Sequence, residues 1–163
     1  MNRRLLILSS VLLSALTLFA CSTSPHGPGW ISLVDGDKGL ENWNKLGDAN
    51  WRAENNAIIA DKGAGGFLVS KNSYKDFVIY AEFWAATNTN SGIFIRATDA
   101  QKVTADNSYE VNIWDIRPDP SYGTGAIVNF AKVPVPLTNK VGGQWNTMEI
   151  TAAGSLMTVK LNG

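Results

Sequence analysis

The stretch "SYEVNIWDI", residues 108–116, alternates between two kinds of side chain. Successive side chains of a β-strand point to opposite faces, so a strand here has one apolar face, formed by Tyr109, Val111 and Ile113. The other face collects a carboxylate, an amide and an indole, from Glu110, Asn112 and Trp114. The alternation predicts a strand with one apolar face in the core and an opposite face that carries polar and aromatic side chains.

Two preceding stretches, "DFVIYAEFWA" (76–85) and "SGIFIRAT" (91–98), repeat this pattern. Their apolar faces consist of Phe77, Ile79, Ala81, Phe83, Ile93, Ile95 and Ala97. The opposite faces carry Tyr80, Glu82 and Arg96 among aromatic residues. Aromatic rings beside fixed hydrogen-bonding groups suit a sugar. The C–H face of a sugar stacks on a ring, and its hydroxyls form hydrogen bonds with carboxylate, amide and guanidinium groups. The alternative is a face that a loop covers, with Glu82 and Arg96 as a buried ion pair.

Short β-rich runs separated by Gly, Asn, Asp and Pro occupy the rest of the chain after residue 30. We expect strands at 30–36, 65–71 and 125–133, a hairpin at 50–61 that turns at Asn55-Asn56, and a final hairpin at 144–163 that turns near Gly154. No run has sustained helical periodicity. The sequence predicts one all-β domain over residues 30–163, an antiparallel sandwich or jelly roll.

The N-terminus predicts export. Residues 1–20 combine Arg3 and Arg4 with an apolar stretch too short for the roughly 20 residues that span a bilayer, which is typical of a signal peptide. The segment ends in "LFAC", which resembles a bacterial lipobox, so we expect lipidation of Cys21, the only cysteine. Residues 21–29 are then a tether. We expect a protein anchored by lipid to the cell envelope, at the outer membrane.

Composition excludes several function classes. Lys plus Arg equals Asp plus Glu, at 14 each, without a basic run, so nucleic acid is not an expected partner. The single histidine, His26, lies in the tether, which argues against a Ser-His-Asp triad or a multi-histidine zinc site. No nucleotide-binding glycine motif is present. We expect no cofactor, although Asp115 and Asp119 are loop acids of the kind that bind Ca²⁺.

Several motifs together resemble the bacterial 3-keto-disaccharide hydrolase family. "GWISLVDGDKGLENW", the Trp51 hairpin, "FLVSKNSYKDFVIYAEF", "NSGIFIRA", "YEVNIWD" and "GTGAI" occur in the family's order over residues 29–163. The resemblance implies a concanavalin A-like lectin/glucanase sandwich. It also implies two further strands beyond "VKLNG", so we expect the domain to be incomplete at its C-terminus.

The resemblance implies cleavage of glycosides already oxidised at C3. The ketone acidifies the C2 proton, so the glycosidic oxygen at C1 leaves by elimination, and water adds afterwards. On chemical grounds we expect Glu110 as the base, Arg96 as the oxyanion stabiliser and Glu82 or Asn112 as a positioning group. Tyr80 and Trp114 are the expected stacking surfaces.

Two other functions fit the same fold. A glucanase needs two carboxylates about 5–10 Å apart. Glu110 and Asp115 fall on opposite faces of a regular strand, so this function is disfavoured. A non-catalytic carbohydrate-binding lipoprotein has the same sequence features as the enzyme, and it remains the alternative.

Overall fold

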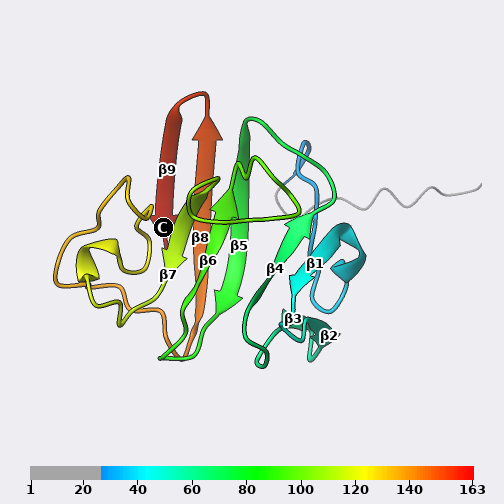
Figure 1. Ribbon diagram of the computed structural model, residues 1–163, viewed down its shortest axis with the longest axis horizontal. Helices are drawn as coiled ribbons and strands as arrows, with labels where there is room; N and C mark the ends of the chain where they lie inside the picture. The colour runs from blue at the N-terminus through cyan, green and yellow to red at the C-terminus, as the bar shows by residue number, and fades with distance from the viewer. Residues whose placement is uncertain (1–26) are drawn as a thin grey trace, which may run out of the picture. The chain divides into compact units, whose positions relative to one another are not determined.

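Nine strands, all paired antiparallel, build the chain from Leu33 to Gly163 in the computed structural model, which describes residues 27–163 (Figure 1). Residues 27–32 belong to a separate unit. The predicted signal peptide, the Cys21 lipidation site and most of the tether lie outside the described residues.

The larger sheet has the strand order β5-β8-β9 and comprises β5 (Phe77–Trp84), β8 (Trp145–Ala153) and β9 (Leu156–Leu161). Along β5, half-buried and exposed side chains alternate at every residue. Hence the predicted apolar face of 76–85 is confirmed. β8 and β9 form the predicted final hairpin, which turns at Gly154 with φ of 55°.

The second sheet pairs β6 (Ser91–Ile95) with β7 (Tyr109–Ile113). Its inner side chains join those of β8 in one hydrophobic core, whose buried members include Ile95, Val111, Ile113, Met148, Ile150 and Ala152. Two sheets that share one core form a sandwich, so the predicted fold class is confirmed.

Two smaller sheets precede the sandwich strands in the sequence. β1 (Trp43–Gly47) pairs with β4 (Gly66–Ser70), and β2 (Arg52–Glu54) pairs with β3 (Ala57–Ile59). The β2–β3 turn has φ of 54° at Asn55 and 58° at Asn56, as the predicted hairpin requires. The helices within residues 27–163 are two 3-10 turns, η1 (Leu40–Asn42) and η2 (Pro120–Tyr122), and neither is long and apolar enough to cross a membrane.

Two predicted strands were wrong. Residues 30–36 contain only an isolated bridge between Asp35 and Lys38. In 125–133 the chain folds back on itself, because Ile127 bridges both Val111 and Ala131 and Asn129 takes a left-handed φ of 68°. The tight turn uses the backbone groups that a continuous strand would offer to a neighbour. The stretch therefore pairs with β7 only over residues 125–128 before it turns back.

Candidate active site

Glu110 lies on the outer face of β7, opposite Phe94 of β6 in the strand register. The ring of Phe94 packs edge-on against Phe67 of β4, with 5.1 Å between ring centroids. The pair formed by Phe94 of β6 and Phe67 of β4 therefore lies beside the carboxylate. This apolar neighbour limits the access of water to Glu110, which is half-buried.

Gly92 makes room for the Glu110 side chain. A Cβ atom at position 92 would lie 3.1 Å from both Cγ and Oε1 of Glu110, and 2.9 Å from the carbonyl oxygen of Val111. The Glu110 side chain therefore extends across the β6 backbone, into space that any other residue at 92 would fill.

Two influences act on the ionisation of Glu110. Burial raises the pKa of its carboxyl above the ordinary value, and the positive charge of Arg117 opposes that rise. Among the described residues, no donor forms a hydrogen bond to this carboxylate. An unbonded carboxylate with a raised pKa is suited to accept a proton.

Arg117 supplies the positive charge that acts on Glu110, and no pattern in the sequence predicts it. Its guanidinium carbon lies 5.4 Å from the centroid of the Trp114 ring, in a cation–π contact. Trp114 itself donates its backbone N–H to the Thr124 hydroxyl at 2.9 Å. One face of the predicted stacking surface is thus occupied by Arg117. Strand periodicity, the signal used for the other residues, ends before this loop position.

Asn112 is fully buried, so the expectation that it lines an open face is wrong. Its amide donates to the carbonyl of Tyr122 at 2.6 Å, and its backbone pairs with Gly125 and Ala126. The segment after β7 therefore covers Asn112, as the alternative of a loop-covered face expected. The amide oxygen has no partner among the described residues.

Arg96 does not lie beside Glu110. It has a left-handed φ of 54°, which breaks the alternation just after β6 ends, and its guanidinium turns away from the site. It donates to the carbonyls of Lys75 and Gly154 and pairs with Asp76 at 3.0 Å. Both the predicted oxyanion role and the alternative pairing with Glu82 are contradicted by this geometry.

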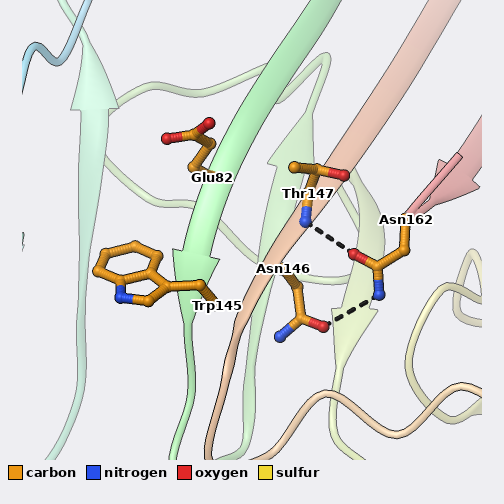
Figure 2. Close-up of a pocket in the computed structure, with 5 residues that line it drawn as sticks. All are labelled: Glu82, Trp145, Asn146, Thr147 and Asn162. Atoms are coloured by element: carbon orange, nitrogen blue, oxygen red, sulfur yellow. Dashed lines mark hydrogen bonds between the residues drawn. The ribbon is translucent and has the colours of Figure 1, made fainter.

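Tyr80 and Glu82 belong to a different face. The apolar faces of the two main sheets enter one core, so their polar faces point to opposite sides of the sandwich. Glu82 on β5 therefore does not share a face with Glu110 on β7. It lines a separate pocket with Trp145 and three polar residues, Asn146, Thr147 and Asn162 (Figure 2).

The two loop acids considered for Ca²⁺ are engaged by protein donors. Asp115 accepts the Thr124 hydroxyl at 2.6 Å and the backbone N–H groups of Val141 and Gly142 at 2.8 and 2.9 Å. Asp119 caps η2 because its carboxylate accepts hydrogen bonds from the backbone N–H and the hydroxyl of Ser121. Protein donors thus engage both carboxylate oxygens of Asp115 and one carboxylate oxygen of Asp119. Within residues 27–163, no cluster of three or more metal-ligating side chains occurs.

The antiparallel sandwich and the Glu110 site define the class of protein, a concanavalin A-like all-β domain with a half-buried carboxylate on one sheet. Residues 29–163 match the model of the 3-keto-alpha-glucoside-1,2-lyase-like domain, and the chain belongs to that family.

One solved structure gives a measure of this likeness. A predicted glycosyl hydrolase from Parabacteroides distasonis ATCC 8503 is 32% identical, with a TM-score of 0.51, over 59% of this chain and 51% of its own. The chain thus spans about half the length of that relative. No curated protein matches the sequence significantly.

Proposed function

We propose that this chain is a carbohydrate-active domain that cleaves glycosides oxidised at C3. The observation that carries the proposal is Glu110, a half-buried carboxylate with a raised pKa, free of hydrogen bonds among the described residues and under the influence of Arg117. Membership of the 3-keto-alpha-glucoside-1,2-lyase-like family and the likeness to a glycosyl hydrolase support it.

In the proposed reaction, the Glu110 carboxylate takes the proton from C2 of the sugar. The electron pair of the C–H bond moves toward the C3 ketone, and the negative charge collects on the C3 oxygen. Arg117, held against Trp114, is the cation that stabilises this charge in place of the predicted Arg96. The enolate then expels the glycosidic oxygen as the C1–O bond breaks, and this oxygen takes up a proton from water. A water molecule then adds to C1 of the C1–C2 double bond, and C2 regains the proton held by Glu110, which restores the carboxylate.

Replacement of Glu110 tests the proposal. Glu110→Gln keeps the side-chain size but removes the base, so kcat/KM for a 3-keto-disaccharide in the full-length protein should fall about 10²–10⁴-fold. Release of reducing sugar is the measurement, and Glu41→Gln, which changes an exposed carboxylate in η1, is the matched control. Cleavage by Glu110→Gln at the parent rate would overturn the assignment.

The carbohydrate-binding alternative gives a different result in the same assay. A binding protein would retain 3-keto-disaccharide without release of sugar, in the parent and in Glu110→Gln alike. A matched titration of both proteins with the intact ligand therefore separates the two functions.

We also propose that the protein is exported and held at the cell envelope by a lipid on Cys21, on the basis of "LFAC" at 18–21 and the preceding apolar stretch. Cys21→Ser should abolish incorporation of labelled palmitate and release the protein from the membrane fraction. Unchanged labelling in that variant would contradict the proposal.

A further inference from the structure

The outer face of the β5-β8-β9 sheet carries two exposed indoles that the Glu110 site does not use. Trp84 and Trp145 lie directly opposite each other in the β5–β8 register, and their exposed fractions are 53% and 65%. Side chains directly opposite on paired strands have Cβ atoms about 5 Å apart. The two indoles are therefore exposed to solvent from directly opposite positions at the same end of this face.

A pocket of about 220 Å³ adjoins this surface (Figure 2). The Glu82 carboxylate and the Trp145 indole lie on its β5 side, and Asn162 closes it on the β9 side. Asn162 accepts the backbone N–H of Thr147 at 2.9 Å and donates to the Asn146 side chain at 3.1 Å. Asn146 in turn donates to the carbonyl of Val141 at 2.9 Å, so hydrogen bonds hold the polar wall in place.

Glu82 is the uncompensated acceptor of this face. The neighbouring outward carboxylate, Glu149, pairs with Lys160 at 2.8 Å. Glu82 has no ion pair or side-chain hydrogen bond among the described residues. Its carboxylate is therefore available to accept hydrogen bonds from a ligand beside Trp145.

We propose that this face, formed by Glu82, Trp84, Trp145, Thr147 and Asn162, is a second carbohydrate-binding site that holds a neutral oligosaccharide without cleaving it. The indoles stack on the C–H faces of successive sugar rings, and Glu82 accepts hydrogen bonds from their hydroxyls. An indole beside one carboxylate also suits an organic cation. The second indole and the amide and hydroxyl groups of Asn162 and Thr147 favour a longer, hydroxyl-rich ligand.

The test is a calorimetric titration of the full-length protein with maltohexaose, with cellohexaose and with tetramethylammonium chloride. We expect one of the oligosaccharides to bind, and Trp145→Ala to weaken that binding at least about tenfold. Trp84→Ala should weaken it in the same direction. Leu156→Ala is the matched control, because Leu156 is 63% exposed on the same sheet but at the opposite end of β8 from Trp145. It should leave affinity unchanged.

Glu110→Gln separates this site from the proposed catalytic one. It should bind the oligosaccharide as the parent does, whatever its effect on cleavage, since Glu110 lies on the other side of the sandwich. Failure of both oligosaccharides to bind would overturn the proposal. So would tighter binding of tetramethylammonium, or binding that Glu110→Gln removes and Trp145→Ala preserves.

Discussion

At the scale of single residues, Gly92 decides where the Glu110 carboxylate lies. The missing side chain at 92 leaves space that Oε1 and Cγ of Glu110 occupy. The carboxylate is thereby held among apolar neighbours, which disfavours its charged form. A site of this kind trades stability for basicity, because the native state at neutral pH must hold a charge that burial penalises.

This trade predicts how stability changes with pH. The folded pKa of Glu110 is raised, so above the unfolded pKa the native state keeps its proton longer than the unfolded state does. The contribution of Glu110 to the free energy of unfolding therefore falls as pH rises through this window. Glu110→Gln should gain stability over the parent as pH rises from about 4 to 7. Urea unfolding at several pH values measures this, and a difference independent of pH would contradict it.

At the scale of the elements, alternation along β6 and β7 separates core from site. Ile95 is 3% exposed and Val111 is fully buried. The side chain of Glu110, which precedes Val111 on β7, points to the opposite, outer face. The segment after β7 then covers part of the outward face through backbone pairs to Asn112. Asp115 secures that segment to Val141 and Gly142. Hydrogen bonds at Asn112 and Asp115 thus hold the loop that carries Trp114 and Arg117.

Burial of Ile95 predicts a measurable loss on truncation. Ile95→Ala should lower the free energy of unfolding by about 2–5 kcal/mol, because the cavity that it leaves lies in the core between the sheets. Ile116→Ala is the control, since Ile116 is 60% exposed and should change stability by no more than about 0.5 kcal/mol. Denaturant unfolding of both variants is the measurement. Equal losses would show that the register of β6 is not as described.

At the scale of the whole domain, Arg96 connects segments that are far apart in the sequence. Its guanidinium binds Lys75 and Asp76 before β5 and Gly154 in the β8–β9 turn. The hydrogen bonds of this guanidinium hold the end of β6 to one end of the larger sheet, where the start of β5 and the β8–β9 turn lie together. The role of Arg96 is therefore to join the two sheets.

Arg96→Ala should lower the free energy of unfolding by about 1–3 kcal/mol, the usual range for hydrogen bonds to a charged group. The kcat/KM of the folded protein for a 3-keto-disaccharide should stay within about twofold of the parent, as expected for a residue away from the reacting atoms. Thermal unfolding and reducing-sugar release on the same sample give both values. A loss of turnover with unchanged stability would indicate that Arg96 acts in the catalytic site.

The class of the fold, the core-facing side chains of β5, β6 and β7 and the two hairpins could be predicted from the sequence, and the role of Glu110 stays a prediction. Each of these follows from short-range rules, namely the two-residue period of strands and the turn preferences of Asn and Gly. Which faces meet became clear only from the tertiary structure. It placed Glu82 and Glu110 on opposite sides of the sandwich and turned Arg96 away through a positive φ. It also brought Arg117 from an irregular loop to Trp114. The physical reason is that sheet partition and loop paths depend on contacts between residues distant in the chain, which local periodicity does not encode.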